Sequence, residues 1–315
     1  MSKIAFIYPG QGAQFVGMGK DVAEKFESAD RFYRLATSAL NQDMKELVFY
    51  SDDETLKITE NTQPALLTTC IALTQPLLDN GIVPDVSAGL SIGEYAAHVI
   101  AGSFSFEDAV QIVKKRGKFM QEEVPLGVGG MAAIMGLEAS DVEECCCTVS
   151  GKYPGMKVEP ANYNCPGQIV IAGNVAAVEE AAELCKRKGA KRALMLAVSA
   201  PFHCSLLKGA GEKLDAELAK VDFQDMKMPV VSNVTATYTE DKALIRESLF
   251  RQVSSPVKWE QCIKKMLENG VTTFVEIGPG KTLAGFMKKI DKNAAVYNVS
   301  DLETLSQTLT ALSKG

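Results

Sequence analysis

The sequence predicts an α/β fold in which a parallel sheet with helices on both faces is interrupted by a small ferredoxin-like domain. Strand-like and helix-like stretches alternate before residue 126 and again after residue 198, which is typical of parallel sheets. Residues 126–198 instead follow the order strand-helix-strand-strand-helix-strand, that of ferredoxin-like domains. The length of 315 residues allows a large domain and a small one. We therefore expect a large domain of residues 1–125 and 199–315 and an inserted domain of residues 126–198.

The first part of the expected large domain begins with a buried strand and leads to a turn that holds Ser91. The strand runs from Ile4 to Tyr8 and ends at the sequence Pro9-Gly10-Gln11-Gly12. Polar and charged helices are expected up to about residue 50, and a long helix at 64–80. A strand at 83–89 then gives way to helices that begin at 92 and 106.

The inserted domain and the last part of the chain supply the remaining elements. In the insert we expect strands at 127–136, 157–163, 168–172 and 192–198, and helices at 140–150 and 175–188. After the insert we expect helices at 206–220 and 302–313, and strands near 230 and at 274–277. This second alternation completes the parallel sheet.

Composition excludes several kinds of partner. The net charge of −6 argues against nucleic acid, and no run approaches the roughly 18 apolar residues of a membrane span. The apolar run near the N-terminus is too short for a signal peptide. Cys145, Cys146 and Cys147 are consecutive, which suits neither a disulfide framework nor zinc spacing. We therefore expect a cytoplasmic protein with reduced thiols and no metal site.

A serine lies between two glycines where a strand changes to a helix. Gly89-Leu90-Ser91-Ile92-Gly93 matches the pattern G-x-S-x-G, in which small residues flank a strained turn and the serine acts as a nucleophile. The helix that follows offers backbone N–H groups to an oxyanion. A helix-capping serine in an ordinary turn is the alternative interpretation.

The chain has two histidines that could serve as the base. His98 lies about 10 Å along the helix axis from Ser91, whereas a base must come within about 3 Å, so we interpret His98 as a core residue. His203 lies in a loop between a strand and a helix, where catalytic groups gather in parallel-sheet proteins. It is the better candidate, with an ordinary loop histidine as the alternative. No acidic third member is evident, and a backbone or amide oxygen could orient the imidazole instead.

Arg116 falls on the apolar face of its helix. At about 100° per residue it lies about 20° from Ala109, while the neighbouring lysines point to the opposite face. A buried guanidinium needs an anionic partner. That partner is either an internal Asp or Glu or the carboxylate of a substrate held by the guanidinium fork.

Seven segments of the sequence, taken in order, are similar to the malonyl-CoA:acyl-carrier-protein transacylase family along essentially the whole chain. They are Pro9–Gln14, Gly89–Ala97, Lys114–Gln121, Asn162–Gly173, Ser199–Leu207, Arg251–Trp259 and Glu276–Gly285. The resemblance implies a hydrolase-like large domain with a ferredoxin-like insert, in agreement with the order of elements above.

The resemblance also implies roles for individual residues. Ser91 would be the nucleophile, His203 its base, and Arg116 the residue that holds the malonyl carboxylate. The other implied site residues are the backbone N–H groups of Gln11 and Ile92 as an oxyanion hole, Gln252 beside the serine and histidine, and Asn162 and Asn164 in the site lining. In one departure, Leu90 stands where the family commonly has histidine before the serine.

The implied reaction transfers a malonyl group from malonyl-CoA to the phosphopantetheine thiol of acyl carrier protein, through a malonyl-serine, for fatty acid synthesis. No metal or bound cofactor is needed, because the partner protein carries the phosphopantetheine. A polyketide malonyltransferase acting in trans is the close alternative. Carrier proteins of this kind are acidic, so docking is expected at a basic patch. One candidate is Lys186, Arg187, Lys188, Lys191 and Arg192, although a solvated helix end explains this cluster as well.

Three alternative functions are less well supported by the sequence. Gly278–Thr282 is similar to a phosphate-binding loop, but Val275 stands where that pattern needs glycine. The stretch from Gly10 likewise begins a dinucleotide-binding motif, but Phe15 stands where its last glycine should be. A serine hydrolase has no need of a buried cation for the acyl tail, so Arg116 discriminates against it. A non-catalytic carrier-binding module predicts no acyl-serine.

Overall fold

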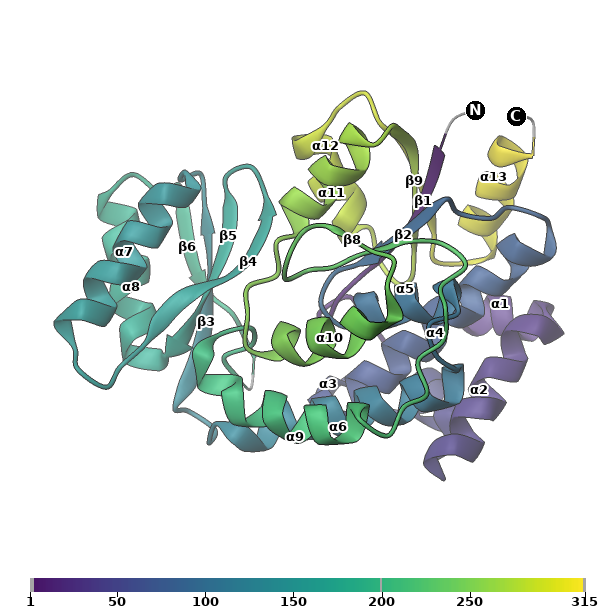
Figure 1. Ribbon diagram of the computed structural model, residues 1–315, viewed down its shortest axis with the longest axis horizontal. Helices are drawn as coiled ribbons and strands as arrows, with labels where there is room; N and C mark the ends of the chain where they lie inside the picture. The colour runs from purple at the N-terminus through teal and green to yellow at the C-terminus, as the bar shows by residue number, and fades with distance from the viewer. Residues whose placement is uncertain (1–2, 199, 314–315) are drawn as a thin grey trace.

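The computed structural model describes residues 3–198 and 200–313 and contains two sheets that lie beside each other (Figure 1). The larger sheet has the order β10-β9-β1-β2-β7-β8. Its strands are β1 (Lys3–Tyr8), β2 (Val86–Gly89), β7 (Val230–Val231), β8 (Tyr238–Thr239), β9 (Val271–Ile277) and β10 (Ala295–Val299). All neighbours pair in parallel except β7 and β8. The predicted parallel sheet is confirmed, with one short antiparallel strand at its edge.

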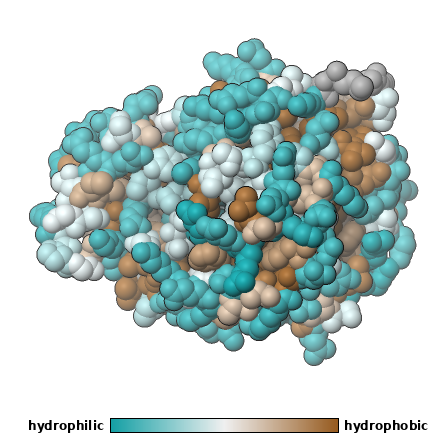
Figure 2. Space-filling view, viewed as in Figure 1, coloured by the Kyte–Doolittle hydropathy of each residue, from teal (hydrophilic) through white to brown (hydrophobic). Residues whose placement is uncertain are grey.

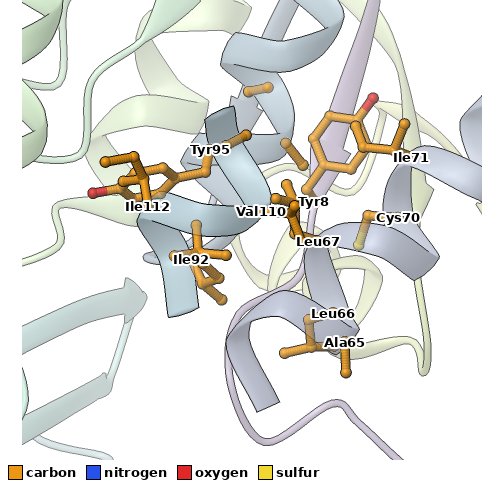
Figure 3. Close-up of a cluster of buried hydrophobic side chains, with 14 of the residues drawn as sticks. Tyr8, Ala65, Leu66, Leu67, Cys70, Ile71, Ile92, Tyr95, Val110 and Ile112 are labelled. Atoms are coloured by element: carbon orange, nitrogen blue, oxygen red, sulfur yellow. The ribbon is translucent and has the colours of Figure 1, made fainter. Parts of the chain in front are cut away.

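Strand β1 separates two apolar cores, because successive side chains of a strand point to opposite faces. Phe6 and Tyr8 pack with α4 (Thr59–Asp79), α5 (Gly93–Ala101) and α6 (Phe106–Glu123). Figure 3 shows Tyr8 from β1 in the same cluster as Leu67 and Ile71 of α4 and Tyr95 of α5. On the opposite face, Ala5 and Ile7 pack with α11 (Trp259–Glu268) and α12 (Thr282–Ile290). Helices therefore cover both faces of the sheet, as predicted.

The remaining helices complete the large domain. They are α1 (Lys20–Lys25), α2 (Glu27–Leu40), α3 (Asp53–Lys57), α9 (Lys208–Leu218), α10 (Ile245–Val253) and α13 (Leu302–Leu312). Short helical turns cover Glu46–Tyr50, Ser205–Leu207 and Lys242–Leu244.

The smaller sheet has the predicted ferredoxin-like arrangement. Its elements in chain order are β3 (Gly129–Met135), α7 (Ala139–Lys152), β4 (Val158–Cys165), β5 (Gln168–Asn174), α8 (Val175–Arg187) and β6 (Arg192–Met195). The sheet order is β4-β5-β3-β6 and every neighbouring pair is antiparallel. Helices α7 and α8 pack on Ile134 and Ile171. Met131 and Val170 instead belong to the core cluster of the large domain, so the second face of the small sheet faces the large domain.

The sequence interpretation missed α3 and, in the last third of the chain, β8, α10, α11, α12 and β10. The missed helices are short, of five to ten residues, and β10 is a half-exposed edge strand with a weak apolar pattern. Strand β6 also ends at Met195 rather than Val198. The expected domain boundaries stay a prediction, and Ser199, which begins the second part of the large domain, lies outside the described residues.

Apolar side chains are mostly enclosed in these cores. The face shown in Figure 2 is largely hydrophilic or neutral, with apolar residues in scattered patches. Within residues 3–198 and 200–313, no helix is both long and apolar enough to cross a membrane. All eight cysteines are free thiols, and seven of them are buried.

Candidate active site

The serine turn joins β2 to α5 and holds Ser91 in a left-handed backbone conformation, with φ of 55°. Such a conformation is strained for a residue other than glycine and persists only where its surroundings fix it. A Cβ on Gly89 would lie 1.9 Å from the carbonyl carbon of Gly93, and one on Gly93 would lie 2.3 Å from the oxygen of Tyr8. Both flanking positions therefore require glycine. The turn is the strained strand-to-helix geometry that the sequence predicted.

His203 is placed to take the proton of Ser91. Its Nε2 lies 2.6 Å from the Ser91 Oγ, and its Nδ1 donates to the main-chain oxygen of Gln252 at 2.8 Å. This second bond leaves Nε2 free to accept the hydroxyl proton. Burial and the nearby Arg116 charge lower the pKa of His203 to about 3, so the imidazole is neutral at physiological pH and competent as a base. The orienting group is a backbone oxygen, one of the two alternatives left open by the sequence.

The Gln252 side chain links the serine turn to Arg116. Its Nε2 donates to the main-chain oxygen of Ser91 at 3.0 Å, and its Oε1 accepts from Nη2 of Arg116 at 3.0 Å. The side chain is fully buried. Gln252 therefore contacts the serine through its amide and the histidine through its main chain.

Arg116 is buried beside the nucleophile, with 1% of its surface exposed. Its Nη2 lies 3.2 Å from the Ser91 Oγ, and its Nη1 donates to Oε1 of Gln63 at 2.8 Å. Its guanidinium also lies 5.5 Å from the centre of the Tyr95 ring. These partners are neutral oxygens and a ring, and the structure shows no ion pair between Arg116 and any Asp or Glu of the described part of the chain. A direct internal salt bridge, the first alternative for this residue, is therefore wrong.

The serine opens onto a cavity of about 630 Å³ between the two sheets. Residues of the large domain that line it include Gln11, Ser91, Arg116 and His203. Asn162 and Asn164 of β4 line it from the small domain, as do Met131 and Val170. The structure thus brings together the side chains expected in the site lining.

The two N–H groups expected to form an oxyanion hole belong to Gln11 and Ile92. Gln11 lines the cavity, and Ile92 directly follows Ser91 at the start of α5. Within the described residues, neither N–H donates a hydrogen bond to another group of the protein. Both are therefore available to an oxygen that gains negative charge next to Ser91.

Comparison with known proteins identifies the family to which this arrangement belongs. Residues 5–306 match the family model of the acyl transferase domain. The chain is 49% identical over 312 residues to the malonyl CoA-acyl carrier protein transacylase of Bacillus subtilis, with 99% of this chain and 98% of that protein covered.

The chain belongs to the malonyl-CoA:acyl-carrier-protein transacylase family.

Solved structures of acyl transferases agree with this assignment. The crystal structure of malonyl CoA-acyl carrier protein transacylase from Clostridium perfringens matches with a TM-score of 0.95 and 47% identity, over 99% of this chain and 98% of that one. A malonyl-transacylase in complex with a type II polyketide acyl-carrier protein matches with a TM-score of 0.95 and 40% identity, over 98% and 100% of the two chains. The resemblance and the fold class inferred from the sequence are both confirmed.

Two further residues of this acyl transferase were singled out in the sequence. His98 is a buried core residue, as predicted, and its Nδ1 lies 2.9 Å from the Oγ of Ser103. Leu90 lines the cavity and packs so closely against the first loop that a Cβ on Gly10 would lie 2.5 Å from its Cδ2. The residue before the nucleophile thus presents an apolar wall in this chain.

The rejected phosphate loop has a structural role in this acyl transferase. Glu276, at the end of β9, is buried and accepts the N–H groups of Leu283 and Ala284 at 3.0 and 2.8 Å. Its carboxylate therefore occupies the first turn of α12, where a phosphate would have to bind.

In the basic cluster at the end of α8, Lys186 and Lys188 pair with Glu183 and Glu144, each at 2.6 Å. These pairs favour the solvated helix end.

Sequence reasoning missed three side chains that support the site: Gln63, Asn233 and Glu94. Asn233 accepts the N–H of Ser91 and donates to the oxygen of Gly89, both at 2.7 Å, and so spans the serine turn. These residues are uncharged or distant in sequence, and no local motif marks Gln63 or Asn233. Glu94 lies within the Gly89–Ala97 segment but reads as an ordinary acidic residue of a first helical turn.

Proposed function

We propose that this chain transfers the malonyl group of malonyl-CoA to the phosphopantetheine thiol of acyl carrier protein and so supplies malonyl groups for fatty acid synthesis. The observation that supports it most is the position of one buried cation beside an activated serine. Arg116 lies 3.2 Å and His203 2.6 Å from the same Ser91 Oγ. A serine with only a base would accept any acyl group, whereas a guanidinium at this distance favours one that ends in a carboxylate.

The first half-reaction acylates the serine. Ser91 Oγ attacks the thioester carbonyl carbon while Nε2 of His203 takes the hydroxyl proton. The carbonyl oxygen becomes an oxyanion and accepts the N–H groups of Gln11 and Ile92. The carbon–sulfur bond then breaks, and the CoA sulfur receives the proton from His203. Arg116 holds the malonyl carboxylate throughout, with Asn162 and Asn164 in contact with the substrate along the cavity wall.

The second half-reaction reverses these steps with a different thiol. His203 takes the proton of the phosphopantetheine thiol, and the sulfur attacks the ester carbon of malonyl-serine. The same N–H groups stabilise the second oxyanion, and Ser91 leaves with the proton. All steps use groups of the chain and its two substrates, so the proposal includes no bound cofactor and no metal.

One experiment separates the proposal from its rivals. The protein is incubated with malonyl-CoA alone, quenched in acid and measured by intact mass. We expect a gain of one malonyl group, about 86 Da, that is absent in Ser91→Ala. Hydrolysis of a simple ester without any adduct would indicate a serine hydrolase. Neither adduct nor hydrolysis would indicate a carrier-binding module.

The identity of the carrier forms a second arm of the test. One relative was solved in complex with a type II polyketide acyl-carrier protein, which favours a polyketide carrier as the second candidate acceptor. Malonyl-loaded enzyme is mixed with a fatty acid carrier and with a polyketide carrier, and the transfer rates are compared. Faster transfer to the fatty acid carrier supports the main proposal, and the reverse order supports the alternative.

The docking surface is tested separately. Charge reversal at Lys186 and Lys188 that leaves the carrier KM unchanged would exclude docking at the basic cluster.

We also propose a cytoplasmic location. Its support is the set of eight free thiols, which persist in a reducing compartment. Thiol counting with a chromogenic reagent on unfolded protein taken directly from cells should give eight free thiols. A lower count restored by reductant would argue against this location.

A further inference from the structure

Glu94 is a buried carboxylate that the mechanism above does not use. It lies in the first turn of α5, three residues after the nucleophile, and none of its surface is exposed. Acidic side chains in a first turn usually face solvent and interact with the helix dipole. A buried carboxylate is costly unless donors hold it, so its partners identify what it does.

The partners of Glu94 come from the elements that form the active site. Its Oε2 accepts from Nε2 of Gln252 at 2.6 Å and from the main-chain N–H of Asn233 at 3.1 Å. Its Oε1 has no hydrogen-bond partner among the described residues and lies 4.0 Å from Nε2 of His98. The shortest bond of the group is therefore the one to Gln252.

This bond fixes which end of the Gln252 amide faces Arg116. An ionised carboxylate and a main-chain oxygen can only accept hydrogen bonds. The NH₂ group of Gln252 therefore faces Glu94 and the oxygen of Ser91, and Oε1 is left to face the guanidinium. A flipped amide would turn its two N–H groups toward a cation that also only donates.

The arrangement also balances charge without a direct ion pair to Arg116. A direct salt bridge between Glu94 and Arg116 would take up the guanidinium fork that the substrate carboxylate needs. With Gln252 between them, the negative charge lies one side chain away. The two charges stabilise each other's ionised forms: Arg116 works to lower the pKa of Glu94, and Glu94 to raise that of Arg116, against burial, which has the larger effect on both.

We propose that Glu94 is a positioning residue that orients Gln252, so that the glutamine presents its amide oxygen to Arg116 and leaves the guanidinium without an ion pair in the described part of the protein, available to pair with the substrate carboxylate. This inference rests on the proposed function, because it assigns a purpose to the absence of an ion pair at Arg116 within the described residues.

A double-mutant cycle tests the proposal. The rate of malonyl-serine formation is measured by rapid quench and intact mass in the wild type, Glu94→Gln, Gln252→Ala and the double variant. We expect Glu94→Gln to lower the rate about tenfold in the wild-type background and less than twofold in the Gln252→Ala background, because residues that act through one another are not additive. Equal losses in both backgrounds, or no loss in either, would overturn the inference.

Two further variants separate positioning from general damage. Glu276 is the matched control, since it is also a buried carboxylate that accepts two hydrogen bonds. Glu276→Gln should lower the melting temperature. Any change that it makes in the rate of malonyl-serine formation should be by the same factor in the wild-type and Gln252→Ala backgrounds. If Glu94→Gln does not fold, Glu94→Asp keeps the charge but retracts the carboxylate, and the same cycle applies. Failure of the wild type to form any adduct would refute the proposed function, whereas a normal adduct with an additive cycle refutes only the role of Glu94.

Discussion

The Oγ of Ser91 lies 2.6 Å from Nε2 of His203, although the two residues are 112 positions apart in the sequence. Both have left-handed backbones, with φ of 55° and 60°. Two strained residues meet here because each belongs to a tight turn at the cavity: one follows β2 and the other precedes α9. Strain of this kind is retained where the surrounding structure fixes it and function needs it.

Loss of the base should slow acylation much more than loss of the other histidine. We expect His203→Ala to lower the rate of malonyl-serine formation by roughly 10²–10⁴-fold, the usual contribution of a general base. His98→Gln is the control, because it removes a buried histidine that contacts neither Ser91 nor the cavity. The rates are measured by rapid quench and intact mass. Similar losses in the two variants would contradict the assignment of His203.

Removal of the buried cation should change which acyl group is accepted. With malonyl-CoA as the substrate, we expect Arg116→Ala to raise the free-energy barrier to acylation by about 3 kcal/mol, the usual cost of leaving a carboxylate without its partner. This corresponds to a loss of roughly a hundredfold in kcat/KM. Acetyl-CoA has no carboxylate, so the ratio of malonyl to acetyl loading should collapse. Arg116→Lys should restore the ratio only in part, since lysine lacks the planar fork. An unchanged ratio in Arg116→Ala would refute the role of Arg116.

The buried histidines should make the protein sensitive to acid. Burial lowers the pKa of His98 to about 3, whereas in the unfolded chain it is about 6.5. Between these values the unfolded state binds the extra proton, so the stability that His98 contributes is present above pH 6.5 and is lost as the pH falls. His98→Gln has no imidazole at this position, so it does not lose stability in this way. Below pH 6.5, we expect the unfolding free energy of the wild type to fall, relative to that of the variant, by about 1.4 kcal/mol per pH unit.

Urea unfolding followed by circular dichroism at pH 7, 6 and 5 measures that difference. Glu276 contributes in the opposite sense, since burial raises its pKa to about 7, but it is present in wild type and variant alike. A difference that stays constant with pH would show that His98 is not held neutral by burial.

The serine turn should tolerate no side chain at its glycines. In Gly89→Ala the new Cβ would meet the backbone of Gly93 and Glu94 at 1.9 to 2.4 Å, and backbone cannot move aside cheaply. We expect a loss of at least about 3 kcal/mol of stability, the range of severe overpacking. Gly285→Ala is the control: a Cβ there meets nothing within 4 Å in α12, and it should be neutral or stabilise by up to about 1 kcal/mol. Thermal unfolding compares the two, and equal melting temperatures would contradict the close packing of the turn.

The sequence alone determined the class of fold and the main chemical groups. Strand and helix alternation predicted the parallel sheet, and the order of elements in residues 126–198 predicted the ferredoxin-like insert. The G-x-S-x-G pattern located Ser91, and the helical spacing around Arg116 predicted a buried guanidinium, which the structure confirms. These features are local: a turn between glycines and the period of one helix are written in a few neighbouring residues.

Only the tertiary structure decided how these groups work together. The main-chain oxygen of Gln252 that orients His203 carries no sequence signal, because every residue has such an oxygen. Asn233, which spans the serine turn, lies 142 residues from Ser91, and Gln63 holds Arg116 from a helix 53 residues earlier. The partner of a buried polar group is chosen by which elements the packing brings within about 3 Å. That choice depends on the whole fold, and the stretch of sequence around Ser91 does not contain it.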